Sequence, residues 1–224
     1  MESRGDAWWK RRMMRLTTIE KRAVNSPEHA RRTVEIGLSL LEHVSLPDRP
    51  ICLELGCGQG ALARLLVERL NARMTATDLD PTQVDLAVAR LKDLGEHISL
   101  RVVDARELPF ADGTFDGVFS FGVMHHIPGG WRRVIADVAR VLTPEGRFIF
   151  TDYYVARWLA APLNRLFPSS EQLMYEPLRE ALAERGFGIT YHTWERQAGG
   201  LLTYGKTIAS KAAGGRRTSK HETR

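Results

Sequence analysis

The segment ICLELGCGQGALARLL, residues 51–66, restricts the fold of this chain more than any other stretch. A run of aliphatic residues enters a turn with glycines at every second position (Gly56, Gly58 and Gly60), and helix-forming residues follow. Glycine lets a backbone approach a ligand closely, and the first N–H groups of the next helix point at that ligand. The segment therefore predicts a strand, a ligand-binding turn and a helix within an open α/β sheet.

Strands and helices alternate along the rest of the chain. We expect strands at 51–55, 74–77, 98–103, 115–119 and 147–151, the last preceded by a turn at 143–146, and helices at 27–44, 61–70, 81–94, 131–142 and 172–185. The expected strands are short and apolar, which is typical of parallel strands covered on both faces. Since helices separate most of them, the pattern predicts a parallel sheet with a helical layer on each side.

The alternation ends after residue 186. The strand-like runs FGITYHTWE and LLTYGKTIAS flank the short glycine-containing connection RQAGG, which predicts a hairpin. A hairpin that closes a parallel sheet would place an antiparallel strand at its edge. The expected fold class is α/β, a doubly wound, mostly parallel seven-stranded sheet with a C-terminal antiparallel hairpin.

The length of 224 residues suits one α/β domain with modest additions. We expect an N-terminal helical cap at 1–48, a main domain at 49–209 with a lid-like insertion at about 153–175, and a basic disordered tail at 210–224. No apolar run approaches the roughly 20 residues that span a bilayer. Because the N-terminus also lacks the apolar region of a secretory signal, we expect a cytoplasmic protein.

The positive charge lies at the two ends of the chain. Residues 1–35 and 206–224 have net charges of +4 and +5, whereas residues 36–205 have a net charge of −4. A nucleic-acid enzyme usually has a basic face around its active site, so this distribution argues against such a partner. The basic, Trp- and Met-rich N-terminus leaves peripheral membrane contact open.

The two cysteines, Cys52 and Cys57, lack the spacing of a zinc pair, and nothing else in the chain completes a ligand set. We therefore expect two packed thiols and no metal.

Acidic residues at the expected strand ends discriminate between ligands. The glycines also match the loose dinucleotide pattern G-x-G-x-x-G/A, so they alone do not exclude NAD. Glu54 precedes the turn and would repel a pyrophosphate, but it would attract an ammonium group. Asp78 ends the next strand, where a carboxylate can accept two ribose hydroxyls. Asp104 ends the third strand, where it can accept a bond from an adenine amine.

Four segments together resemble class I S-adenosylmethionine-dependent methyltransferases, in particular the small-molecule branch that includes the ubiquinone/menaquinone-biosynthesis C-methyltransferases. They are LELGCGQG (53–60), ATDLDPTQV (76–84), VVDARELPFADGTFDGVFSFGVMHHI (102–127) and RVLTPEGRFIFTDYY (140–154). With the hairpin, the resemblance covers roughly residues 50–209. It implies the Rossmann-like methyltransferase fold, S-adenosylmethionine as cofactor and S-adenosylhomocysteine as product.

The resemblance also implies roles for individual residues. The glycine turn and Glu54 would face the methionine part of the cofactor, Asp78 the ribose, and the remaining residues the adenine or the methionine end. The expected cofactor-binding residues are Glu54, Gly56, Gly58, Gly60, Asp78, Leu79, Asp104, Ala105, Ser120 and Phe121.

Methyl transfer from a sulfonium is an in-line displacement, so positioning the acceptor supplies much of the catalysis. A base is needed only where the accepting atom starts protonated. Candidates are His126, His125 and Tyr153, with Asp152 and Tyr154 beside them. A structural role is open for each of them.

The segments expected to cover the pocket are rich in large apolar groups. In 1–25 and 153–175 these are Trp8, Trp9, Met13, Met14, Tyr153, Tyr154, Trp158, Leu159, Leu163, Phe167 and Tyr175. They favour a small apolar or aromatic acceptor, although the same residues could simply pack helices onto the core. RWLAAPLNRLF is expected to be a short lid helix.

Two other functions fit parts of the pattern. An NAD(P)-dependent oxidoreductase would share the glycines and Asp78, but Glu54 argues against it and no catalytic Tyr/Lys or Cys/His arrangement is recognisable. A non-catalytic cofactor-binding regulator would keep the pocket without turnover. The accepting atom and the oligomeric state are not encoded in any motif of the chain.

Overall fold

The computed structural model describes residues 18–166, 173–197 and 202–211. The expected pocket residues Trp8, Trp9, Met13, Met14 and Phe167 and most of the basic tail lie outside this part of the chain. No helix in the described part is both long and apolar enough to cross a membrane.

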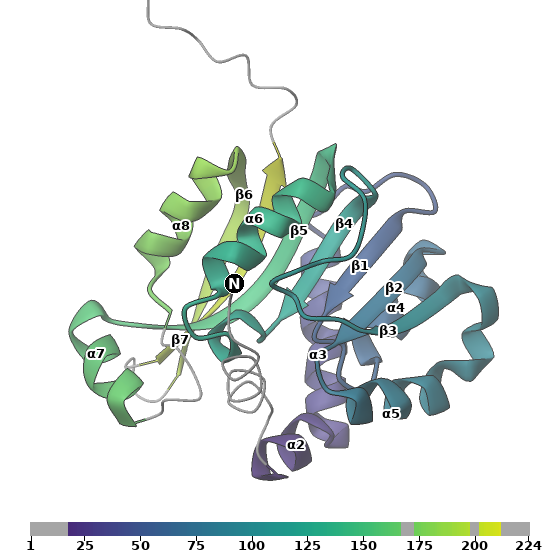
Figure 1. Ribbon diagram of the computed structural model, residues 1–224, viewed down its shortest axis with the longest axis horizontal. Helices are drawn as coiled ribbons and strands as arrows, with labels where there is room; N and C mark the ends of the chain where they lie inside the picture. Colours follow the sequence, from purple (N-terminus) through teal and green to yellow (C-terminus); the bar gives the residue numbers. More distant parts are fainter. Residues whose placement is uncertain (1–17, 167–172, 198–201, 212–224) are drawn as a thin grey trace, which may run out of the picture.

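A seven-stranded sheet forms the centre of the molecule (Figure 1), with the strand order β3-β2-β1-β4-β5-β7-β6. Its strands are β1 (Ile51–Leu55), β2 (Arg73–Asp78), β3 (Ile98–Val102), β4 (Phe115–Phe121), β5 (Leu142–Val155), β6 (Phe187–Gln197) and β7 (Leu202–Lys211). The first five are parallel, and β7 is antiparallel to both of its neighbours. The expected α/β class, seven strands and C-terminal hairpin are confirmed.

The position of the hairpin corrects one expectation. The antiparallel strand β7 lies inside the sheet, between β5 and β6, and the edge strand β6 runs parallel to the first five. The side chains of β7 explain this position, because they are buried on both faces of the strand, among them Tyr204, Ile208 and Ala209. An inserted strand buries these groups better than an edge strand would.

Helices cover both faces of the sheet (Figure 1). α6 (Trp131–Val141) and α8 (Tyr175–Glu184) pack on one face, and α3 (Pro27–Leu41), α4 (Ala61–Leu70) and α5 (Pro81–Leu91) pack on the other. The remaining helices are α2 (Thr18–Val24), α7 (Arg157–Leu166) and two 3₁₀ turns, η1 (Lys92–His97) and η2 (Met124–His126).

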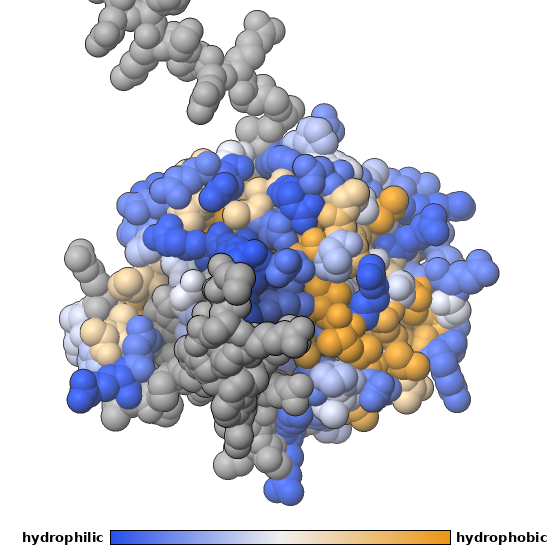
Figure 2. Space-filling view, in the orientation of Figure 1, coloured by the Kyte–Doolittle hydropathy of each residue, from blue (hydrophilic) through white to orange (hydrophobic). Residues whose placement is uncertain are grey.

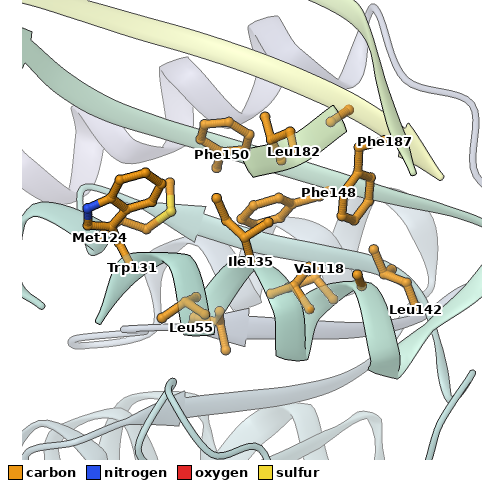
Figure 3. Close-up of a cluster of buried hydrophobic side chains, with 14 of the residues drawn as sticks. Leu55, Val118, Met124, Trp131, Ile135, Leu142, Phe148, Phe150, Leu182 and Phe187 are labelled. Carbon is orange, nitrogen blue, oxygen red and sulfur yellow. The ribbon is translucent and has the colours of Figure 1, made fainter. Parts of the chain in front are cut away.

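The core beneath α6 is aromatic and aliphatic (Figure 3). Phe148 and Phe150 from β5 stack with ring centroids 4.6 Å apart, and Ile135 of α6 and Leu182 of α8 pack in the same cluster. These side chains are fully buried, so each excludes water from the sheet. This packing fixes β4 and β5, whose carboxyl ends carry side chains that line a cavity.

Several boundaries differ from the expected ones. α3 ends at Leu41 rather than residue 44, and α5 ends at Leu91, where the chain tightens into η1. The expected turn at 143–146 belongs to β5 as an irregularity, because Phe115 pairs with Leu142 and Gly117 with Arg147.

The connection between β3 and β4, residues 103–114, contains no helix. Figure 2 shows hydrophobic residues gathered on the side of the molecule where β1, β2 and β3 lie, whereas the surface over α6 is mostly hydrophilic. Val102 of the edge strand β3 is 53% exposed.

Candidate active site

A cavity of about 370 Å³ lies at the carboxyl ends of the parallel strands. Six adjacent strands supply its lining in the order of the sheet, with one side chain from or just after each: Asp104 (β3), Asp78 (β2), Glu54 (β1), Phe121 (β4), Tyr153 (β5) and Tyr204 (β7). β7 contributes from its beginning because it runs antiparallel to its neighbours. The cavity therefore has an acidic half, over β3-β2-β1, and an aromatic half, over β4-β5-β7.

Glu54 is the most deeply buried carboxylate of the acidic half. It is 4% exposed, and its Oε2 has no hydrogen-bond partner among the described residues. Burial, and next the charge of Asp78, raise the pKa of Glu54 to about 8. A buried acceptor without a partner is costly, so this oxygen is suited to a ligand that brings a donor or a cation.

Asp78 connects the glycine turn to the start of α5. Its Oδ2 accepts the N–H of Gly58 at 3.0 Å, and its Oδ1 accepts the N–H of Asp80 at 2.9 Å. Burial raises the pKa of Asp78, while these backbone bonds oppose the rise. Since each carboxylate oxygen has two lone pairs, both oxygens retain acceptor capacity towards the cavity.

Asp104 is held by a neighbour that the sequence reasoning did not consider. Arg106 contacts the Asp104 carboxylate through Nη2 at 2.6 Å and through Nε at 3.0 Å, and its backbone N–H donates at 2.9 Å. Leu79 and Ala105 line the same end of the cavity. The ion pair orients Asp104, and a role in binding adenine stays a prediction.

Gly56 and Gly58 line the cavity, but two other expected ligand residues do not. Gly60 begins α4 with φ +85°, and a Cβ there would lie 2.4 Å from Cδ1 of Leu91. This glycine is therefore explained by helix packing. Ser120 is fully buried in β4, and its Oγ has no partner among the described residues.

The aromatic half contains a histidine held by a carboxylate. Nδ1 of His125 lies 2.6 Å from Oδ1 of Asp152, and Asp152 is fully buried in β5. Oδ2 of Asp152 also accepts the N–H of Met124 at 3.0 Å. The His126 ring lies tilted against that of His125 with ring centroids 3.9 Å apart, and both histidines line the cavity. Asp152 therefore orients His125 and is not itself exposed to a ligand.

The two neighbouring tyrosines of β5 point to opposite faces of the sheet. Tyr153 lines the cavity, where its ring lies 4.9 Å from that of Tyr204. Tyr154 packs into the core on the α6 face, and burial raises its pKa well above the ordinary value. Strand alternation thus makes only Tyr153 a candidate for ligand contact. Among its described residues, α7 supplies none to the cavity lining, and Trp158 is 70% exposed.

One face of α3 forms a cavity wall that the sequence reasoning missed. His29, Arg32, Thr33 and Ile36 line the cavity, at the spacing of residues that share a helix face. The pKa of His29 is lowered by burial and then by the charge of Arg32. The apolar stripe of this helix was recognisable, but nothing local indicated that its neighbouring polar face would meet a cavity.

α2 lies beside the acidic half. Lys21 forms an ion pair with Asp80, and Nε2 of Gln59 in the glycine turn donates to the carbonyl oxygen of Val24 at 3.3 Å. Val24 itself lines the cavity. The N-terminal helices thus contact the main sheet domain next to the glycine turn.

Comparison with known proteins shows which proteins this chain is similar to. Residues 52–146 match a family described as a methyltransferase domain. The chain is 34% identical over 103 residues to 27-O-demethylrifamycin SV methyltransferase of Amycolatopsis mediterranei, covering 45% of this chain and 38% of that protein. It is 29% identical over 143 residues to demethylmenaquinone methyltransferase of Tropheryma whipplei, covering 59% of this chain and 58% of that one. The chain thus spans less than half of the first relative and under two thirds of the second.

A solved structure has the same fold. Geranyl diphosphate C-methyltransferase from Streptomyces coelicolor A3(2), in complex with Mg²⁺, geranyl diphosphate and S-adenosyl-L-homocysteine, superposes with a TM-score of 0.69 and 14% identity. The match covers 84% of this chain and 85% of that one. The resemblance inferred from the sequence is therefore confirmed: residues 52–146 match a methyltransferase domain, and the relatives that the chain matches are small-molecule methyltransferases.

Proposed function

We propose that this protein transfers a methyl group from S-adenosylmethionine to a small apolar or aromatic acceptor by in-line displacement. The observation that carries the proposal is the division of one cavity into an acidic and an aromatic half along six adjacent strands. The acidic half suits the hydroxyl and ammonium groups of the cofactor. The aromatic half suits an acceptor.

The acidic half has the groups that the cofactor requires. Asp78 would accept the ribose hydroxyls, and Glu54, with its unpartnered buried oxygen, would accept the ammonium of the methionine part. Gly58 has φ +50° and no atom closer than 3.8 Å to an added Cβ, so its backbone is open to a ligand. Leu79, Asp104 and Ala105 would surround the adenine.

When bound, S-adenosylmethionine supplies an electrophilic methyl group on a good leaving group. The chain would contribute orientation, because Phe121, Tyr153 and Tyr204 form a wall against which an apolar ring can stack. The same wall excludes water from the reacting atoms. Holding the acceptor in line can supply much of the rate enhancement.

His125 is the best placed base for an acceptor that starts protonated. With Nδ1 donating to Asp152, Nε2 is the basic nitrogen of the ring, and it would take the proton from the acceptor. His126 and Tyr153 would pack beside the acceptor rather than exchange protons. An acceptor whose reacting atom carries no proton would not need this step.

The relatives favour small-molecule acceptors. One is named for a methylation of 27-O-demethylrifamycin SV and the other for one of demethylmenaquinone. We extend to this chain only their shared chemistry, a bulky acceptor that a cavity with aromatic walls can hold. Within this proposal, residues 49–209 are the catalytic domain, and the helices before residue 49 cover its cavity.

The test is calorimetric titration of the full chain with S-adenosylmethionine, S-adenosylhomocysteine and NAD. We expect saturable binding of both adenosyl ligands and none of NAD. An acceptor panel of phenols, hydroquinones and aliphatic amines would then be assayed with methyl-labelled cofactor. Binding of NAD alone, or of no adenosyl ligand, would overturn the proposal. Adenosyl binding without turnover on any acceptor would favour a cofactor-binding regulator instead.

A further inference from the structure

Arg32 places a positive charge in the aromatic half of the cavity. Its guanidinium carbon lies 5.5 Å from the ring centroid of Tyr204, and both residues line the cavity. Within the described part of the chain Arg32 has no ion-pair partner, whereas its neighbour Arg31 pairs with Glu35. The charge of Arg32 is therefore available to whatever the cavity holds.

The helix that carries Arg32 and the aromatic ring that its guanidinium faces are each held in place. α3 begins at the N-cap Ser26 and is held against α4 by close packing: a Cβ at Gly37 would lie 2.7 Å from Cδ2 of Leu65. The hydroxyl of Tyr204 donates to Oγ1 of Thr151 at 2.6 Å, which fixes the ring. A guanidinium over an aromatic face keeps its N–H groups in a plane and able to bind further groups.

The charged groups around Arg32 do not neutralise it. The charge of Arg32 contributes to lowering the pKa of His29, one turn earlier on the same face. The cavity carboxylates Glu54, Asp78 and Asp104 come from β1, β2 and the end of β3, on the far side of β4 and β5 from Tyr204. A further carboxylate, Asp152 of β5, lies behind the aromatic half, but it is fully buried, does not line the cavity and has its oxygens bonded to Nδ1 of His125 and to backbone N–H groups. Among the described residues the lining of the aromatic half thus carries the Arg32 guanidinium and no carboxylate, so this end of the cavity favours an anion.

We propose that Arg32 binds a carboxylate on the molecule that occupies the aromatic half of the cavity. The fork of a guanidinium matches the two oxygens of a carboxylate and holds them by two charge-assisted hydrogen bonds. The inference rests on the proposed function, in which Glu54 holds the amino-acid end of the cofactor in the acidic half of the cavity. The carboxylate at Arg32 therefore belongs to the acceptor.

Two calorimetric arms distinguish a carboxylate on the acceptor from the carboxylate of the cofactor. The first compares S-adenosylhomocysteine with its decarboxylated analogue, which differs only in the carboxylate. The second titrates protein saturated with S-adenosylhomocysteine with 4-hydroxybenzoate and with 4-hydroxybenzamide. Both arms use the full-length chain and the variants Arg32→Gln and Arg31→Gln, the latter being a matched control on the same helix.

We expect a preference of roughly tenfold for the carboxylate in the second arm, lost in Arg32→Gln and kept in Arg31→Gln. A preference in the first arm that is lost in Arg32→Gln would assign Arg32 to the cofactor and overturn the inference. Equal binding with and without the carboxylate in the second arm, or a preference there that persists in Arg32→Gln, would also refute it. If S-adenosylhomocysteine does not bind the unmodified protein at all, the proposed function fails instead.

Discussion

Nδ1 of His125 lies 2.6 Å from a carboxylate oxygen of Asp152, a residue that is itself fully buried. The same carboxylate accepts the backbone N–H groups of Met124 and Tyr153, at 3.0 and 2.8 Å. One buried charge therefore connects the end of β5 to the turn that carries the histidine pair. It is compensated by backbone and imidazole donors, as a buried carboxylate must be.

Replacement Asp152→Asn tests whether this contact serves catalysis. An asparagine side chain has only one acceptor oxygen, whereas the carboxylate of Asp152 accepts bonds at both oxygens. One of these bonds is therefore lost, and His125 should be less firmly oriented. We expect kcat to fall by about 10²-fold on an acceptor that requires a base, with the affinity for S-adenosylhomocysteine unchanged. Steady-state kinetics and calorimetry on the same preparation check both quantities.

A merely structural role for Asp152 would give a different result. The affinity for S-adenosylhomocysteine would then fall together with kcat, and the thermal midpoint would drop. His125→Asn provides the companion variant, since it removes the proposed base and leaves the Asp152 carboxylate in place. Activity unchanged in both variants would contradict the assignment of His125.

Asp78→Ala should weaken binding of S-adenosylhomocysteine by about 100-fold. The substitution removes the two charge-assisted hydrogen bonds that Asp78 would accept from the ribose hydroxyls, each of about 1.5–3 kcal/mol. The net loss of binding free energy is smaller than their sum. Asp78→Asn keeps the shape of the turn and separates loss of charge from loss of backbone support. Asp85→Ala on the exposed face of α5 is the control. Retention of full affinity in Asp78→Ala would exclude this residue from the site.

The pKa of about 8 at Glu54 predicts how stability depends on pH. Between about pH 5 and pH 8 the folded protein keeps a proton that the unfolded chain has released, because the ordinary pKa is about 4.3. The free energy of unfolding should therefore fall as the pH rises, by about 1.4 kcal/mol per unit in this window.

Glu54→Gln should lose this dependence. Urea unfolding at pH 5.5, 6.5 and 7.5 would show the variant gaining stability relative to the unmodified protein as the pH rises. Two parallel stability profiles would mean that Glu54 is ionised throughout this range in the folded protein.

Tyr204→Phe should destabilise the fold by about 1–3 kcal/mol. The variant keeps the ring next to Arg32 but leaves the buried Oγ1 of Thr151 without its donor. Tyr191→Phe is the control, because the described structure shows ring stacking of Tyr191 on His43 and no hydrogen bond from its hydroxyl. Equal urea midpoints for the two variants would show that the Tyr204–Thr151 bond contributes no net stability.

Features encoded by neighbouring residues were predictable from the sequence. β1 and α4 have the expected bounds, and Asp80 caps α5 through the N–H of Thr82 at 2.9 Å, as a residue before a proline in the first turn suggests. The acidic half follows from such local units, since Glu54, Asp78 and Asp104 each lie at or just after the end of a strand.

Features that depend on distant packing were not predictable. The polar face of α3 meets the cavity only because its apolar face docks on α4, and Arg32 gave no local sign of this. Ser120 and its neighbour Phe121 point to opposite faces of β4, and which of these faces meets the cavity depends on the pairing of β4 with β1 and β5. The inserted position of β7 depends on partners in β5 about 50 residues away.

This insertion has a consequence for the order in which the protein folds. The strands of the acidic half are contributed by residues 51–102, whereas the aromatic half requires β5 to find β7 across a long intervening segment. Closing a long loop is slower than forming neighbouring contacts. A partly folded chain would therefore complete the acidic half of the cavity before the aromatic half has formed. Hydrogen exchange during refolding should protect β1 and β2 earlier than β7.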